Sequence, residues 1–310
     1  MSVGASVLEG PRIERRRILV EGVSYWCTPD GDELVLGDGR RVEETTAAYL
    51  PPVDPTKIIC VHLNYESRRL EFNQPELVTP TYFQKPLTTL NSHRGTVCRP
   101  ADSRYLNYEG ELAAIVGAPM RNVAPDDVWD HLAGFAPSND MGLHDFRDTD
   151  AGSMLRVKGQ DGFCPIGPGI VSGVDVRQST LRTYVNGEIV QEGQLGEMNF
   201  GIDYLLADLC RHITLLPGDV VLTGTPANSR PLDLGDMVEV EITGVGRISN
   251  TIIEIPAPPH EVGHQPTDTK TVRAVALGSE YQRLRDLARV SAEGEGADGE
   301  GADGEGADGG

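Results

Sequence analysis

The sequence predicts a mixed fold dominated by β-strands, with a small β-rich module ahead of a larger domain. Runs of β-branched residues are short and are separated by residues typical of turns. Asn186-Gly187 stands between apolar flanks, which is a strong signal for a tight β-hairpin. Helical spacing of apolar residues occurs in only a few segments, so we expect strands to outnumber helices.

The first 50 residues form the predicted N-terminal module. Residues 18–27 are typical of a strand, and Pro29-Asp30-Gly31 and Gly37-Asp38-Gly39 are turn signals between further strand-like stretches. A proline-rich linker at 51–55 ends this module. The larger domain is predicted to span 57–255, with strands at 57–62, 111–116, 181–185, 220–223 and 238–242.

Three segments carry a helical pattern. Residues 125–131 place two aspartates in the first turn, and residues 202–212 repeat apolar side chains at helical spacing. A C-terminal extension over 256–291 contains a third, short amphipathic helix predicted at 279–290. Residues 292–310 repeat glycine, alanine, aspartate and glutamate, so we expect a disordered acidic tail.

Charge and composition exclude several classes of protein. A formal net charge of −20 opposes binding to nucleic acid or to anionic membranes, because both require a cationic surface. No apolar run approaches the roughly 20 residues of a membrane span, and none is suited to a signal peptide. The five cysteines are scattered and form no Cys-x-x-Cys pair, which is typical of reduced thiols. We therefore expect a cytoplasmic protein.

Three carboxylates form the strongest candidate for a functional site. Glu109 and Glu111 are two residues apart at the entry to an apolar strand, so they share one face. Buried like charges need a compensating cation, although the spacing alone fits a solvated strand end at least as well. Asp140 ends a second segment, and an all-oxygen set of two glutamates and one aspartate suits Mg²⁺ or Mn²⁺.

A second pattern, His260-Glu-Val-Gly-His264, matches the zinc-protease motif His-Glu-x-x-His. That motif works only on a helix, where the two histidines share a face. Prolines stand before and after the segment and Gly263 lies within it, so a helix is disfavoured. We do not expect zinc there.

Six ordered blocks resemble the fumarylacetoacetate hydrolase superfamily over residues 57–254. The resemblance implies a β-sandwich or roll with few helices. It points to the branch of 2-hydroxyhepta-2,4-diene-1,7-dioate isomerases and 5-carboxymethyl-2-oxo-hex-3-ene-1,7-dioate decarboxylases. The blocks are Leu63-Asn64-Tyr65, Tyr108-Glu-Gly-Glu111, Gly134-Phe135 with Asn139-Asp140, Arg156-Val-Lys158 with Asp161-Gly162, Val185-Asn186-Gly187-Glu188 with Gln191, and Pro217 through Pro226.

The resemblance also implies roles for individual residues. The divalent ion would be held by the three carboxylates, Glu109, Glu111 and Asp140. Lys158 would be catalytic, with its ammonium directed at the oxygens of the substrate. Thr225 would bind the carboxylate of a 2-oxo acid, and Gln191 would lie at the substrate-facing rim. The other expected substrate contacts are Arg156 and His144.

Arg68 and Glu71 are catalytic candidates that depart from the pattern of the family. Many hydrolases of the superfamily carry a histidine three residues before a glutamate on a mobile lid. Arginine stays protonated and cannot take a proton from water, so the usual base for hydrolysis is missing. We expect Arg68 and Glu71 to lie on a lid, with Arg68 pairing with a distal substrate carboxylate. His144-Asp145 likewise replaces the Arg-Asp pair of many relatives.

The resemblance, together with these residues, implies isomerisation or decarboxylation of a small, enolisable 2-oxo dicarboxylic acid in aromatic-compound catabolism, through a metal-bound enolate. An acylpyruvate- or fumarylpyruvate-type C–C bond hydrolase is the first alternative. A catalytically silent metal-binding relative is the second. The resemblance, together with the symmetry habit of soluble enzymes, also predicts a homodimer.

Overall fold

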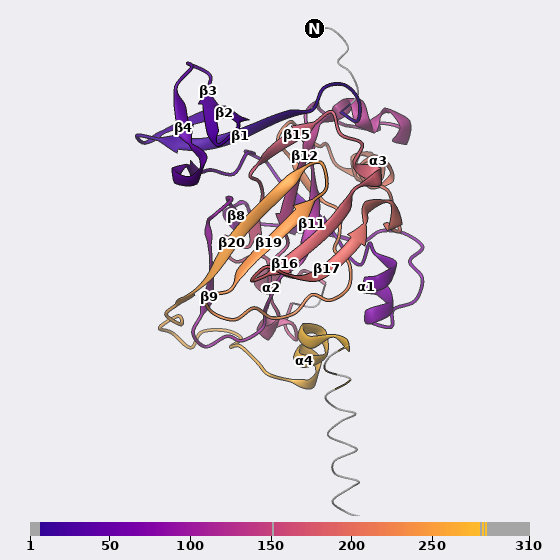
Figure 1. The fold of residues 1–310 in the computed structure, drawn as a ribbon. Coiled ribbons are helices and arrows are strands. Elements are labelled where there is room, and N and C mark those ends of the chain that lie inside the picture. The colour runs from indigo at the N-terminus through magenta and orange to yellow at the C-terminus, as the bar shows by residue number, and fades with distance from the viewer. Residues whose placement is uncertain (1–6, 151, 280, 282, 284–310) are drawn as a thin grey trace, which may run out of the picture.

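Two β-sheets dominate the protein (Figure 1). The structure, a computed structural model, describes residues 7–150, 152–279, 281 and 283. One sheet has eleven strands and the other has five. This strand-dominated architecture confirms the predicted fold class. Within the described residues, no helix is long and apolar enough to cross a membrane.

The large sheet runs from the N-terminal strands through the centre of the protein. Its strands in spatial order are β4 (Arg41–Glu43), β3 (Glu33–Leu36), β2 (Val23–Asp30), β1 (Ile13–Val20), β15 (Gly169–Ser172), β12 (Leu132–Asn139), β11 (Gly110–Val116), β18 (Val220–Leu222), β6 (Ile58–Val61) and β7 (Tyr82–Lys85). A short strand, β5 (Ala48–Tyr49), also pairs with β1. The N-terminal strands therefore extend the same sheet that crosses the main domain, because β1 pairs antiparallel with β15.

The second sheet lies across β11 and β12 (Figure 1). Its strands in spatial order are β17 (Glu188–Gln194), β16 (Thr180–Val185), β19 (Met237–Ile242), β20 (Gly246–Ile255) and β9 (Thr96–Pro100). Asn186 and Gly187, both with positive φ, connect β16 to β17 and confirm the predicted hairpin. Two smaller pairs complete the β-structure: β10 (Leu106–Asn107) with β13 (Gly142–Leu143), and β8 (Leu90–Asn91) with β14 (Cys164–Pro165).

The helices are short and lie outside the sheets. The α-helices are α1 (Glu66–Glu71), α2 (Leu155–Lys158), α3 (Ile202–His212) and α4 (Lys270–Leu277). The 3₁₀ helices are η1 (Glu44–Thr46), η2 (Leu87–Thr89), η3 (Pro125–His131), η4 (His144–Phe146), η5 (Val176–Gln178) and η6 (Leu195–Glu197). The helix predicted at 202–212 is confirmed as α3, and the segment at 125–131 forms the 3₁₀ helix η3.

Parts of the predicted C-terminal structure lie outside the described residues. These parts are the tail at 292–310 and most of the helix predicted at 279–290. The structure instead shows α4 just before that segment. The segment with His260 and His264 is irregular rather than helical, as its flanking prolines predict.

Strand β11 separates two hydrophobic cores. All seven of its residues are buried. Leu112 and Ala114 face the core shared with α3, while Ala113 and Ile115 face a second core with β6 and α2. Because side chains alternate along a strand, Glu111 belongs to the same face as Ala113 and Ile115. The acidic end of β11 is thus directed toward the open end of the second core.

Candidate active site

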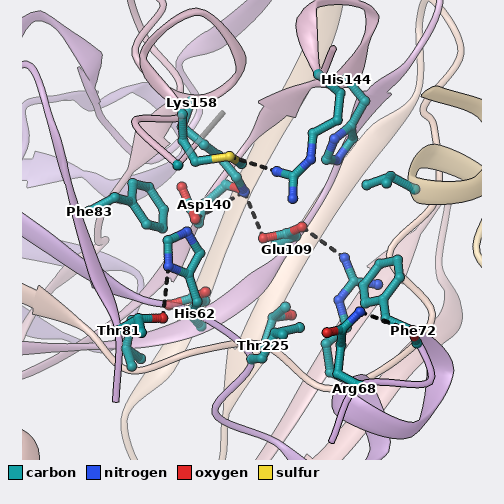
Figure 2. A pocket seen from close by; sticks show the side chains of 18 residues that line it. His62, Arg68, Phe72, Thr81, Phe83, Glu109, Asp140, His144, Lys158 and Thr225 are labelled. Atoms are coloured by element: carbon teal, nitrogen blue, oxygen red, sulfur yellow. Dashed lines mark hydrogen bonds and ion pairs between the residues drawn. The ribbon is translucent and has the colours of Figure 1, made fainter. Parts of the chain in front are cut away.

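The candidate site lies at one end of the large sheet, where several strand ends meet. Strands β6, β18 and β12 share one direction, so their C-terminal ends lie beside the N-terminal ends of antiparallel β11 and β7. A pocket of about 400 Å³ opens at this end. Figure 2 shows Glu109, Asp140, Lys158 and Thr225 directed into it.

Strand pairing brings the three carboxylates together. Residue Gly110 pairs with Asn139, so Glu109 and Asp140 stand side by side, and the Asp140 amide donates to the Glu109 carbonyl at 2.8 Å. Carboxylate oxygens of Glu109, Glu111 and Asp140 lie within 4.8 Å of one another, and all three residues are buried. No second group of three such potential ligands occurs within the described part of the chain.

A glycine turn fixes the Glu111 carboxylate. Its Oε2 accepts a hydrogen bond of 2.7 Å from the backbone amide of Gly224. Gly224 has a φ of +100°, and a Cβ there would lie 2.7 Å from the Cβ of Asn64. A side chain is therefore excluded at this position. The turn places Thr225 on the wall of the pocket beside the carboxylates.

Two buried lysines neutralise part of this negative charge. Lys158 Nζ lies 2.6 Å from Glu109 Oε2 and 3.0 Å from Asp140 Oδ2. Lys85 Nζ lies 2.5 Å from Asp140 Oδ1 and is fully buried. The sequence analysis missed Lys85. The sequence does carry a signal for Lys85. Residues two apart in a strand share a face, and Lys85 stands two residues after Phe83 on the inward face of β7.

The carboxylates differ in how their pKa values are shifted. Burial raises the pKa of Glu111 well above its ordinary value, and the charges of Asp140 and Glu109 raise it further. Burial would also raise the pKa of Glu109, but Lys158 and Arg68 outweigh it, so that pKa is lowered. A divalent cation would relieve the repulsion at Glu111. The donor set, its burial and its excess of negative charge therefore fit a hard metal ion.

Helix α1 places Arg68 and Glu71 at the edge of the pocket. Arg68 is buried; its guanidinium donates to Glu71 Oε2 at 2.8 Å and to Glu109 Oε1 at 2.9 Å. It also lies over the Phe72 ring, 4.4 Å from the centroid. Glu71 accepts a second ion pair, at 2.7 Å, from Arg230. Both Arg68 and Glu71 are thus held by contacts within the protein.

The four expected substrate contacts occupy different positions. Thr225 and His144 line the pocket. Gln191 is buried behind Thr225 and donates to its Oγ1 at 3.0 Å, so it supports the wall rather than forming the rim. Arg156 does not line the pocket; its side chain is half exposed and pairs with Asp150 at 2.7 Å. Residues two apart on a helix do not share a face, and Lys158 occupies the inward one.

The C-terminal extension also contributes to the pocket. Val275 of α4 is a lining residue. The extension is anchored beneath the site, because Asn107 Nδ2 donates to the Ala276 carbonyl at 2.8 Å and the Thr267 amide donates to the Asp145 carbonyl at 2.9 Å. The sequence carries no readable signal for this docking, since the contacts involve backbone groups and one side-chain amide from segments that are distant along the chain.

Two histidines line the pocket as neutral groups. Burial lowers the pKa of His144 well below its ordinary value, and Lys158 and Arg147 lower it further. Neither ring nitrogen of His144 has a hydrogen-bond partner in the structure. Burial likewise lowers the pKa of His62, whose Nδ1 lies 3.2 Å from Thr81 Oγ1 (Figure 2). Both imidazoles are therefore neutral near neutral pH, and each keeps one unprotonated ring nitrogen.

The raised pKa of Glu111 predicts a pH-dependent metal affinity. A carboxyl with a raised pKa keeps its proton at a higher pH, and a metal ion binds only the ionised form. Affinity for Mg²⁺ or Mn²⁺ should therefore fall as the pH decreases, and binding should release protons. Calorimetry from about pH 5 to about pH 8, in buffers of different ionisation enthalpy, measures both effects. A pH-independent affinity without proton release would contradict this prediction.

Comparison with known proteins supports the resemblance found in the sequence. The family described as fumarylacetoacetate (FAA) hydrolase C-terminal matches residues 57–253. An uncharacterized protein of Archaeoglobus fulgidus is 38% identical over 72% of this chain and 89% of its own length. The homoprotocatechuate catabolism bifunctional isomerase/decarboxylase of Escherichia coli is 36% identical over 77% of this chain. The match spans only 55% of that relative's own length.

Further similarity extends to a tautomerase and to solved structures. The mitochondrial oxaloacetate tautomerase fahd2 of Xenopus laevis is 34% identical over 66% of this chain and 67% of its own length. The crystal structure of 5-carboxymethyl-2-hydroxymuconate delta-isomerase from Mycobacterium smegmatis matches with a TM-score of 0.72 and 30% identity. That match covers 78% of this chain and 99% of the other.

Proposed function

Since the chain belongs to the fumarylacetoacetate hydrolase family, we propose that it is a divalent-metal-dependent enzyme that isomerises or decarboxylates a small 2-oxo dicarboxylic acid. The observation that carries the proposal is the buried set of three carboxylates beside Lys158 in the pocket at the end of the large sheet. The names of relatives add support, because they include isomerases and a bifunctional isomerase/decarboxylase.

The carboxylates of Glu109, Glu111 and Asp140 would hold the metal ion, Mg²⁺ or Mn²⁺. When bound, the ion supplies positive charge that stabilises negative charge developing on the 2-oxo oxygen of the substrate.

The other pocket residues bind the substrate and move its protons. The Thr225 hydroxyl is held by Gln191 and can donate to a substrate carboxylate. The Lys158 ammonium stays charged, because Asp140 and Glu109 outweigh the effect of burial and raise its pKa. It can therefore bind an anionic oxygen. The neutral imidazoles of His62 and His144 can take a proton from the carbon next to the 2-oxo group and return it elsewhere.

The position of Arg68 favours isomerisation or decarboxylation over hydrolysis. Hydrolysis needs a base that activates water, and the residue at the lid position is a guanidinium paired with two carboxylates. Isomerisation needs proton transfer on the substrate itself, without an activated water. The hydrolase alternative therefore lacks its usual catalytic group on α1.

Similarity to an oxaloacetate tautomerase supports a related second candidate. Oxaloacetate is itself a 2-oxo dicarboxylic acid, and its keto–enol tautomerisation needs the same charge stabilisation and the same proton transfer. This candidate differs from the first in its substrate rather than in its site.

A panel of 2-oxo acids, followed by ultraviolet loss of the conjugated enol, tests the proposal. The panel includes oxaloacetate, acetylpyruvate and 2-hydroxyhepta-2,4-diene-1,7-dioate, each with Mg²⁺ and with chelator. We expect metal-dependent turnover of a diacid, by isomerisation or by loss of CO₂, without hydrolytic cleavage into two organic acids. Cleavage of acetylpyruvate would favour the hydrolase. Metal binding without turnover of any acid would favour a catalytically silent relative.

A further inference from the structure

The pocket contains three cationic side chains that differ in their partners. Arg68 donates to two carboxylates, Glu71 and Glu109. Lys158 is paired with Glu109 and Asp140. Arg147 also lines the pocket, yet it forms no ion pair with any described residue. Its guanidinium donates a hydrogen bond to the sulfur of Met154, which is a weak acceptor.

Acidic residues near Arg147 in the sequence are all engaged elsewhere. The Asp145 carboxylate accepts from the backbone amides of Arg104 and Tyr105, at 2.9 and 2.8 Å. Asp148 accepts a 2.6 Å hydrogen bond from the Thr269 hydroxyl. Asp150 pairs with Arg156 at 2.7 Å. Three aspartates therefore lie close to Arg147 in the sequence, but none of them pairs with its guanidinium, and Arg147 lines the pocket.

An unpaired guanidinium inside a pocket costs stability. Burial lowers the pKa of Arg147 below its ordinary value, which reflects loss of water around the charge. Arg147 is partly buried and is attracted by the charge of Glu109, but it forms no ion pair with a described residue. Charges removed from water are ordinarily paired, so this guanidinium points to an anionic ligand. The backbone of Arg147 is held in place, because its amide donates a hydrogen bond of 2.9 Å to the His144 carbonyl at the end of a 3₁₀ turn.

The charges of the pocket agree with a doubly charged ligand. Its lining carries three carboxylates, at Glu109, Glu111 and Asp140, and three cations, at Arg68, Arg147 and Lys158. These six charges cancel when all of the groups are ionised. Lys85, beside Asp140, and Glu71, beside Arg68, add one further charge of each sign and leave this balance unchanged. A divalent metal ion adds two positive charges, which a dianionic substrate neutralises. A monoacid would leave one positive charge in a partly buried site.

From this geometry we propose that Arg147 binds the second carboxylate of the substrate and selects dicarboxylic over monocarboxylic 2-oxo acids. Arg68 then acts on Glu109 as a positioning residue instead of reading the far end of the substrate. The inference rests on the proposed function, and it names the residue that sets substrate class at the same site. A guanidinium suits this role because its planar fork matches a carboxylate.

Kinetics of Arg147→Gln with a diacid and a monoacid test the inference. We expect the KM for oxaloacetate to rise about 10- to 100-fold, as for loss of a charged hydrogen bond. The KM for acetylpyruvate, a monoacid, should change less than about twofold. Arg147→Lys should recover part of the loss, since it restores charge without the fork. Arg68→Gln should impair both substrates equally. Arg211→Gln, on the exposed face of α3, is the control.

A stability measurement separates substrate recognition from a structural role. Removing an unpaired, desolvated charge should leave the melting temperature of Arg147→Gln unchanged or raised. Marked destabilisation, or equal KM losses for both acids, would overturn the inference.

Calorimetric binding distinguishes failure of this inference from failure of the proposed function. The full chain with Mg²⁺ is titrated with oxaloacetate and with acetylpyruvate. If neither acid is turned over, loss of oxaloacetate binding alone in Arg147→Gln supports the inference although the enzymatic proposal fails. Equal binding of oxaloacetate to parent and variant, or no binding to the parent, overturns it.

Discussion

Replacing Glu111 with glutamine should abolish turnover while leaving the folded protein at least as stable as the parent. Glutamine keeps the side-chain oxygen that accepts from the Gly224 amide, so the turn before Thr225 is preserved. It removes one of the three charges that would hold the metal ion. Loss of charge stabilisation worth several kcal/mol corresponds to a fall in kcat/KM of about 1000-fold or more.

The stability of Glu111→Gln follows from the sign of the pKa shift. The pKa of Glu111 is raised in the folded protein, so the folded state holds its proton more tightly than the unfolded state. Ionised Glu111 therefore destabilises the fold at neutral pH, and this cost vanishes as the pH falls below the unfolded pKa. Glutamine should raise the melting temperature at neutral pH, and the difference should shrink in acid. Thermal melts in chelator, from neutral pH down to a pH below the unfolded pKa, measure this difference in melting temperature.

Glu188→Gln is the matched control for this prediction, because Glu188 is exposed at the start of β17 and is not one of the residues that line the pocket. It should change neither turnover nor melting temperature. Full activity of Glu111→Gln in chelator-treated buffer would refute the assignment of the carboxylates as metal ligands.

Replacing Lys158 with methionine should cost both activity and stability. Methionine has a similar length but no charge, so Glu109 and Asp140 lose an ammonium that lies within 3.0 Å of each. Removing one partner of a buried ion pair typically costs about 3–5 kcal/mol. Turnover should fall together with stability, because the same ammonium is proposed to bind the substrate.

Denaturant unfolding in chelator and in Mg²⁺ tests the origin of this loss. A divalent ion compensates the same carboxylates, so Mg²⁺ should restore stability to Lys158→Met more than to the parent. Lys270→Met, at an exposed site in α4, is the control. Unchanged stability of Lys158→Met in chelator would show that the carboxylates do not depend on this lysine.

Local pattern was enough to predict several features of the fold. Short apolar and β-branched runs predicted β11 and β16, and the turn chemistry of Asn186-Gly187 predicted the hairpin that joins β16 to β17. The shared face of Glu109 and Glu111 also follows from strand geometry alone. These features depend on residues close in the sequence, whose relative positions a single backbone conformation defines.

Other features were decided by contacts between distant segments. Asp140 reaches Glu109 only through pairing of β12 with β11, and Lys85 reaches Asp140 only because β7 closes the sheet. Spacing could not predict the partners of Arg68 either, nor that Arg147 forms no ion pair among the described residues.

By itself, the sequence determined the fold class, its family and the set of acidic residues suited to a hard metal ion. Tertiary structure decided which cations form ion pairs with those acids and which cation at the pocket does not pair with any described residue. The physical reason is that a charge interacts with whatever lies within a few ångströms, however distant in the chain. Arg68 and Arg147 illustrate this, because both are arginines at the pocket and only their folded surroundings distinguish the paired cation from the one that we propose binds substrate.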